Sequence, residues 1–388
     1  MASRSVATLV VVVLVLMTTA FAAPGRSTRA KGKKAKAMFA HRVEENRPGR
    51  GRKVKNALND PRTIEVFKDF DAWFGEAREA STLAVMGKVQ GIDHFVHPMS
   101  ELADGISPNA DVVLLTSNGV GDAVTRQRQN QPAAQANLEA FVRAGGVLIV
   151  DMGDNDAEGG YLAPGSIGTP TLTFPAPAAD DATFTKVAAG PDGVLGTDDD
   201  HRLVRGPDGL AGTVDDLTNA NIDMCCAVAH GHLEDGLGLP SNARVIETAS
   251  FEDVSRPILA EYCLGSGRVI VDTVTKEFAG HQPEGSGPSY FLQSLLAYAL
   301  DPLEHTPCQI SGLREDVARM ARGRAAQLDA KLAAAQRFLE ANRSSAACGQ
   351  LRAFANQVLV ERKKGLPRPV SDWWVQTATD IGAAIGCK

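Results

Sequence analysis

The sequence predicts an α/β protein: a doubly wound, mostly parallel sheet followed by a small all-α helical bundle. Two short apolar runs, residues 112–115 (VVLL) and 147–150 (VLIV), indicate the sheet. Neither run alternates with polar residues, which is typical of parallel strands covered on both faces. Between them, Leu138, Phe141 and Val142 share one helical face. The bundle is indicated by a change to Ala-rich helical sequence after residue 308.

The first 23 residues have the pattern of a secretory signal peptide. Arg4 supplies a positive charge, residues 9–17 form an apolar run, and three alanines between residues 20 and 23 suit cleavage. The run is too short to span a membrane. Cleavage would therefore leave an exported protein without a transmembrane segment, located in the periplasm, outside the cell or on the cell surface.

Residues 24–60 are rich in Lys and Arg, and we interpret them as a flexible basic arm. A solvated linker is the simpler interpretation, and contact with the envelope or a polyanion is the alternative. The whole chain of 388 residues carries a net charge of −6, which gives no indication of nucleic-acid binding.

The α/β domain is expected over residues 61–303. A strand–helix–strand unit over residues 110–156 is its centre: Pro132 is tolerated in the first helical turn, and Gly145-Gly146 ends the helix. Such a unit connects two parallel strands with a right-handed crossover. The other expected strands are 63–67, 92–96, 243–249, 256–262 and 268–274, and the other expected helices are 70–80 and 290–300. A Gly-Ser-Gly turn should join the last two strands as a hairpin.

An insertion over residues 157–218 interrupts this alternation and is rich in Gly, Pro and Asp. It contains the repeat GPDGVLGTDDD from residue 190 and GPDGLAGTVDD from residue 206. Calcium needs several converging oxygens, and glycines let a loop wrap tightly enough to supply them. The candidate calcium ligands are Asp192, Asp198, Asp200, Asp208, Asp215 and Asp216. The alternative is a pair of solvated turns. These units resemble the GPDGxxGTxDD repeats of exported bacterial proteins, which are usually regarded as calcium-binding-like.

Residues 308–388 are expected to form an antiparallel helical bundle, since apolar residues recur with a helical period along three segments. Cys348 begins one of these helices and Cys387 ends the next, so antiparallel packing would place them side by side. We predict a Cys348–Cys387 disulfide. Cys308 is then expected to bond to the large domain, through Cys225, Cys226 or Cys263. The even number of cysteines, six, agrees with disulfides in an exported chain.

The segments DVVLLTSNG, LEAFVRAGGVLIVDMGD, HGHLEDGLGLPSNARVI and RPILAEYCLGSGRVIVDTVTKEF resemble the class I glutamine amidotransferase-like fold, especially its non-catalytic exported members. Enzymes of that family need a Cys after the strand matching VLIVD, and a His and a Glu after the strand matching RVIVDT. Here Met152 and Gly153 occupy the first turn, and of the second pair only Glu277 matches. The resemblance therefore implies the fold without amidotransferase activity, because that chemistry requires a thiolate and a His base.

A different chemistry at the same edge of the sheet is the alternative. Carboxylates and imidazoles after the strands could act as acid and base or bind a metal, and ligands bind at the carboxyl ends of such sheets. Asp151, His232 and Glu277 are the candidate catalytic residues of an exported hydrolase-type enzyme. Asp154, Asp156, His230 and His281 could join them. Strand-end Asp residues often only close a turn or cap a helix.

The run LDAKLAAAQRFLEANRSSAACGQLRAFANQV resembles the FIMAH domain, a helical module at the C-termini of exported bacterial proteins. The resemblance implies an accessory module without catalytic residues, which binds an unidentified protein or envelope component. The simpler interpretation of its Leu and Phe stripe is core packing. The sequence therefore favours an exported, non-catalytic binding or surface-associated protein that contains a calcium-stabilised insertion.

Overall fold

A computed structural model gives the structure of the protein, and the described residues lie in one compact unit. They are residues 62–69, 76–116, 123–152, 162–166, 172–173, 185–187, 203, 205, 210, 212, 232–233, 239–251, 254–274, 289–320 and 322–388. The expected signal peptide and basic arm, residues 1–60, lie outside these ranges.

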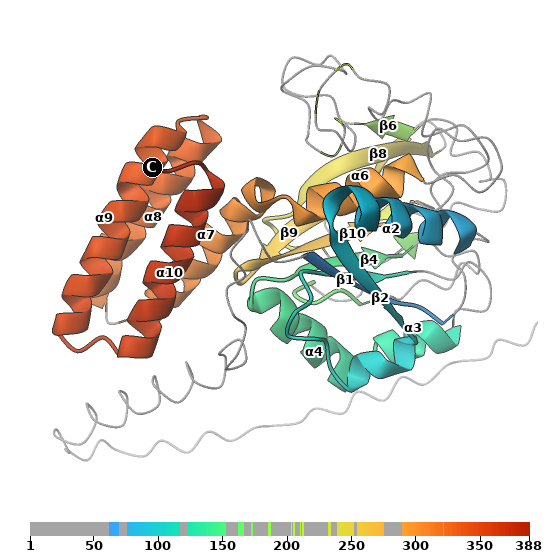
Figure 1. Ribbon diagram of the computed structural model, residues 1–388, viewed down its shortest axis with the longest axis horizontal. Coiled ribbons are helices and arrows are strands. Elements are labelled where there is room, and N and C mark those ends of the chain that lie inside the picture. Colours follow the sequence, from blue (N-terminus) through green and yellow to red (C-terminus); the bar gives the residue numbers. More distant parts are fainter. Residues whose placement is uncertain are drawn as a thin grey trace, which may run out of the picture. The chain divides into compact units, whose positions relative to one another are not determined.

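The described strands form one mixed sheet of eight strands in the order β2-β1-β3-β4-β10-β9-β8-β6 (Figure 1). The first five run parallel, and β9, β8 and β6 are antiparallel to their neighbours. A separate pair contains β5 (Leu172–Thr173) and β7 (His232–Leu233). The strands of the large sheet are β1 (Arg62–Phe67), β2 (Ile92–His97), β3 (Val112–Leu115), β4 (Val147–Asp151), β6 (Thr185–Val187), β8 (Arg244–Phe251), β9 (Val254–Leu264) and β10 (Gly267–Asp272).

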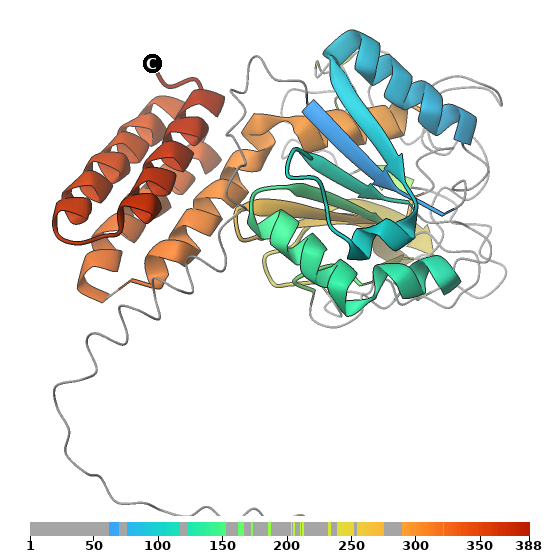
Figure 2. The same ribbon diagram turned by 60° about the horizontal axis from the view of Figure 1, so that its bottom comes forward.

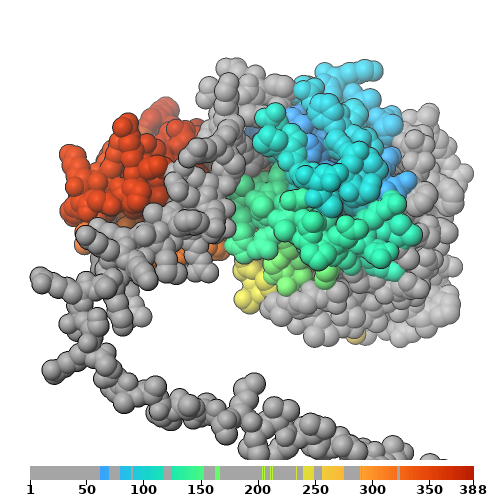
Figure 3. Space-filling view, turned by 90° about the horizontal axis from the view of Figure 1, so that it is seen from below, coloured from blue at the N-terminus to red at the C-terminus, as the bar shows by residue number. Residues whose placement is uncertain are grey.

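Helices cover both faces of the sheet, which confirms the predicted α/β class (Figures 1 and 2). On one face, α2 (Glu76–Gln90) and α6 (Tyr290–Leu300) pack against Ile149 and Ile270. On the other face, α4 (Pro132–Arg143) packs with Leu148 and Val150, in a core that Met99 and Leu102 of the 3₁₀ helix η2 (Met99–Ala103) join. Figure 3 views the molecule from this second side, where the cyan-to-green surface belongs mainly to η2, α3 (Ala123–Gln129) and α4. The strands thus lie between two separate apolar cores.

The central strand–helix–strand unit matches the sequence prediction closely. Pro132 is the first residue of α4, and Gly145 after its end has φ +100°, a conformation that glycine adopts at little cost. By contrast, the sequence does not predict the helix α3, because its sequence AVTRQRQ lacks an apolar stripe. The helix expected over residues 70–80 is α2, which continues to Gln90, ten residues beyond the expected end. Residues 70–75 lie outside the described part.

The sequence predicts no strand in the Gly/Asp-rich insertion, yet β6 lies within this segment. It pairs antiparallel with β8 at one edge of the sheet. The predicted hairpin is present: β9 and β10 pair antiparallel around Gly265 and Ser266, and Gly265 has φ +61°. Part of the insertion therefore belongs to the sheet itself.

The helix α7 (Pro302–Ala318) is bonded to this hairpin through a disulfide between Cys263 on β9 and Cys308. Cys263 was one of three expected partners of Cys308. A Cβ atom at Gly312 of α7 would overlap the Ser266 side chain, so the helix lies directly against the turn. The expected boundary between the two domains, residues 304–307, lies within α7.

Three further helices follow: α8 (Arg322–Glu340), α9 (Ser344–Lys363) and α10 (Arg368–Ala384). Each packs against α7 or its chain neighbour. The predicted apolar stripes face inward, since Leu332, Phe354 and Trp374 are almost completely buried. The predicted Cys348–Cys387 disulfide is present and joins the start of α9 to the residue that follows the end of α10 by three positions.

Glu361 forms a polar junction between α8 and α9 and is 4% exposed. Its carboxylate accepts hydrogen bonds from Gln357 (3.0 Å) and Lys364 (3.1 Å), and Arg324 lies 3.4 Å away. Burial opposes ionisation of Glu361, but these hydrogen bonds and positive charges outweigh it and lower the pKa below its ordinary value of 4.5.

Glu361→Gln should lower the free energy of unfolding by about 1 kcal/mol at neutral pH. Since the folded-state pKa is depressed, the contribution of Glu361 is present above pH 4.5 and is lost as the pH falls through that lower pKa. Denaturant unfolding of both proteins at stepwise lower pH measures the difference. The exposed Glu340→Gln is the control, and a difference that grows on acidification would contradict this account.

Candidate functional site

The carboxyl ends of the parallel strands β1, β3, β4 and β10 lie side by side, and the sequence predicts an active site there. Asp151 ends β4 and Asp272 ends β10, and the two are direct neighbours in the parallel ladder. Both are completely buried. They continue the face of Ile149 and Ile270, which lies toward α2 and α6. Asp151 is therefore part of the interior at this edge of the sheet.

Met152 occupies the turn position after β4, where an amidotransferase would carry its nucleophile. Its backbone N–H donates to the Asp272 carbonyl at 2.7 Å, which continues the β4–β10 pairing by one residue. The side chain is completely buried in the core on the α4 side. This position thus holds an inert, buried thioether.

Of the other predicted site residues, His232 alone is among the residues that the structure describes. The backbone of His232 lies in β7 opposite Thr173. Glu277 lies outside the described residues. The remaining rim candidates, Asp154, Asp156, His230 and His281, and the candidate calcium ligands, Asp192, Asp198, Asp200, Asp208, Asp215 and Asp216, also lie outside them. The proposed grouping of Asp151, His232 and Glu277 therefore stays a prediction.

A polar cluster that the sequence did not predict lies just after β1. The carboxylate of Asp69 is 5% exposed and forms an ion pair with Arg128 at 2.7 Å. It also accepts hydrogen bonds from the Thr125 hydroxyl (2.9 Å) and the Met99 N–H (3.1 Å). Asp69 therefore ties the end of β1 to α3 and η2. This contact explains how α3 forms without an apolar stripe of its own.

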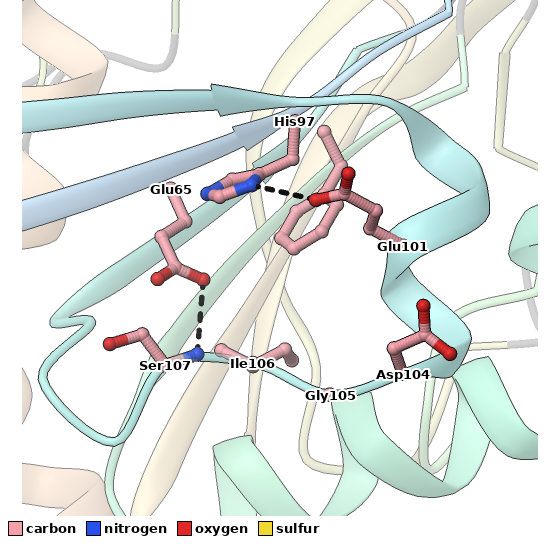
Figure 4. A pocket seen from close by; sticks show the side chains of 8 residues that line it. Glu65, His97, Glu101, Asp104, Gly105, Ile106 and Ser107 are labelled. Atoms are coloured by element: carbon pink, nitrogen blue, oxygen red, sulfur yellow. Dashed lines mark hydrogen bonds and ion pairs between the residues drawn. The ribbon is translucent and has the colours of Figure 1, made fainter.

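Beside this cluster, an open hollow of about 420 Å³ lies between β1, β2 and the turn after η2 (Figure 4). The His97 ring stacks on Phe67, with 5.1 Å between ring centroids, and its Nδ1 lies 3.1 Å from Glu101 Oε2. On the opposite wall, Glu65 Oε2 accepts the Ser107 N–H at 3.2 Å. Asp104, Gly105 and Ile106 complete the lining.

The hollow combines an aromatic floor with three carboxylates, those of Glu65, Glu101 and Asp104, and with the imidazole of His97, which Glu101 holds. Such a lining can orient a small polar or cationic ligand, and the imidazole can exchange a proton with it. None of its side chains is a thiol. The sequence signal that could have revealed it is a His at the predicted end of the second strand, followed four residues later by Glu.

Neither models of known protein families nor the curated proteins contain a match to this chain. Within the described ranges, no group of three or more His, Cys, Asp or Glu side chains is arranged to hold a metal ion. Over the same part of the chain, no helix combines the length and apolar character that crossing a membrane requires.

Asp69→Asn should lower the free energy of unfolding by about 2 kcal/mol, because it leaves the Arg128 charge without its partner and weakens two hydrogen bonds. Denaturant unfolding measures this loss. Asp104→Asn changes an exposed carboxylate nearby and should leave stability within about 0.5 kcal/mol of the wild type. Equal effects of the two substitutions would show that Asp69 does not organise this end of the sheet.

Proposed function

We propose that the protein is an exported, non-catalytic binding or surface-associated protein. In this proposal an amidotransferase-like scaffold carries a calcium-stabilised insertion and a helical interaction module. The buried Met152 carries the proposal: glutamine hydrolysis by this fold needs a thiolate at that turn, and a buried thioether cannot attack a substrate.

The C-terminal helices support an interaction role. Their apolar stripes are used internally, as the burial of Leu332, Phe354 and Trp374 indicates. On the outer surface of α9, Leu359 and Val360 are adjacent and are 41% and 44% exposed. In the proposed FIMAH-like module, these exposed side chains would contact the protein or envelope component.

Export is supported by the cysteines as well as by the N-terminal sequence. The structure contains two disulfides, Cys263–Cys308 and Cys348–Cys387. Structural disulfides persist in oxidising compartments and are rare in the cytosol. The proposed location is therefore the periplasm, the cell surface or the medium.

Glutamine hydrolysis by the full chain should equal the buffer rate, since the nucleophile position holds Met152. A coupled assay for released glutamate measures it. The matched arm is a panel of ester, amide and glycoside substrates tested on the wild type and on Asp151→Asn. Turnover that Asp151→Asn abolishes without changing the melting temperature would replace the proposal with the hydrolase hypothesis.

Calcium at millimolar concentration should raise the melting temperature relative to chelator, because a ligand that binds only the folded state stabilises it. The stabilisation is about 2.7 kcal/mol when calcium exceeds its dissociation constant about 100-fold. Asp198→Asn combined with Asp215→Asn should reduce the shift, and magnesium should give a smaller one. Equal melting temperatures in calcium and chelator would refute the calcium part of the proposal.

A further inference from the structure

The strand β2 is an edge strand with exposed apolar side chains. Among the described strands it pairs only with β1 (Figures 1 and 2). Phe95 is 53% exposed and Val96 is 51% exposed, and they point to opposite faces of the strand. Edge strands are normally protected by Lys, Pro or bulges. The sequence IDHFVH contains neither Lys nor Pro, and its register with β1 is continuous over six residues.

The hydrogen bonds to β1 show which peptide groups of β2 face outward. The carbonyl of His97 accepts the Lys68 N–H at 2.9 Å, so the peptide groups of His97 face β1. Because this direction alternates along a strand, those of Phe95 and Asp93 also face β1. The N–H and C=O groups of Ile92, His94 and Val96 therefore point away from the sheet. They form a row of donors and acceptors that an added strand can pair with.

We propose that β2 pairs antiparallel with β2 of a second copy of this chain, about a two-fold axis at Phe95. In this register His94 of one copy exchanges two hydrogen bonds with Val96 of the other, and the reverse pair does the same. Phe95 then lies opposite Phe95 in a non-hydrogen-bonded pair, where side chains approach most closely. The sheets of the two copies become continuous.

The side chains select the second copy and this register. A two-fold axis at Phe95 places the two Phe95 side chains opposite each other. It also sets Asp93 of each copy opposite His97 of the other. Moving the axis to His94 preserves the backbone bonds, but it opposes the two His94 rings and faces Asp93 toward Phe95. The strand is thus self-complementary in one register. Two six-residue strands bury little area, so we expect a weak, reversible dimer.

Sedimentation velocity over a hundred-fold range of concentration tests the proposal with the full chain. The wild type should shift from monomer to dimer. Phe95→Lys should remain monomeric, because two like charges would face each other at the axis. Val96→Pro should also weaken the dimer, since it removes an outward N–H and leaves the bonds to β1 intact. Leu303→Lys, an equally drastic change of a side chain on α7 that is 50% exposed, should dimerise normally.

Cysteine cross-linking tests the register. Under mild oxidation, Phe95→Cys should form a covalent dimer, because directly opposed residues of such a pair lie within disulfide distance. His94→Cys should not, and the wild type under the same oxidation shows the background from its own cysteines. A wild type that is monomeric throughout, or a dimer that survives Phe95→Lys, would overturn the proposal. Cross-linking through His94→Cys alone would overturn the register.

Discussion

The parallel pairing of β4 with β10 is the contact on which the rest of the fold depends. It joins the strand–helix–strand unit to a hairpin more than a hundred residues later in the chain. The pairing begins where the Arg268 N–H donates to the Gly146 carbonyl, and a Cβ atom at Gly267 would overlap this carbonyl and that of Val142. The end of α4 and the start of β10 can therefore meet only because Gly267 has no side chain.

The buried guanidinium of Arg268 connects this strand pair to the carboxyl end of α6. Arg268 is 1% exposed, and its Nη2 donates to the carbonyls of Tyr298 and Ala299 at the end of α6. The Tyr298 hydroxyl donates to Glu261 of β9 at 2.7 Å. Burial raises the pKa of Tyr298 well above its ordinary value, which keeps the hydroxyl protonated as a donor. The carboxyl end of α6 is thus fixed to β10, directly before α7 and its disulfide to β9.

The two edges of the sheet, formed by β6 and β2, differ in origin and in exposure. At one edge, β6 from the Gly/Asp-rich segment pairs with β8, so a stretch that lacks a strand-like pattern still completes a ladder. At the other edge, β2 exposes the side chains of Phe95 and Val96 and alternate peptide groups. At the carboxyl ends of the strands, by contrast, the structure buries its acidic groups: Asp69 in an ion pair, and Asp151 and Asp272 in the interior.

The sequence by itself determined the elements whose signals are local. The unbroken apolar runs of β3 and β4, the Pro132 start and Gly145 end of α4, the Gly-Ser-Gly hairpin and the C-terminal stripes all predicted what the structure contains. The Cys348–Cys387 bond followed from the antiparallel packing of neighbouring helices. In each case the information lies within one element or between two elements that are neighbours in the chain.

Only the tertiary structure decided the features that depend on distant partners. The helix α3 has no apolar stripe, and its contacts are with distant residues: Asp69, more than fifty residues earlier, bonds Thr125 and Arg128, and Gln129 bonds the Leu162 carbonyl. Cys308 had three candidate partners, and the packing of α7 on the hairpin selected Cys263. The hollow beside His97 and the open edge of β2 arise from the order of strands in the sheet, because no local pattern states which strand lies outermost.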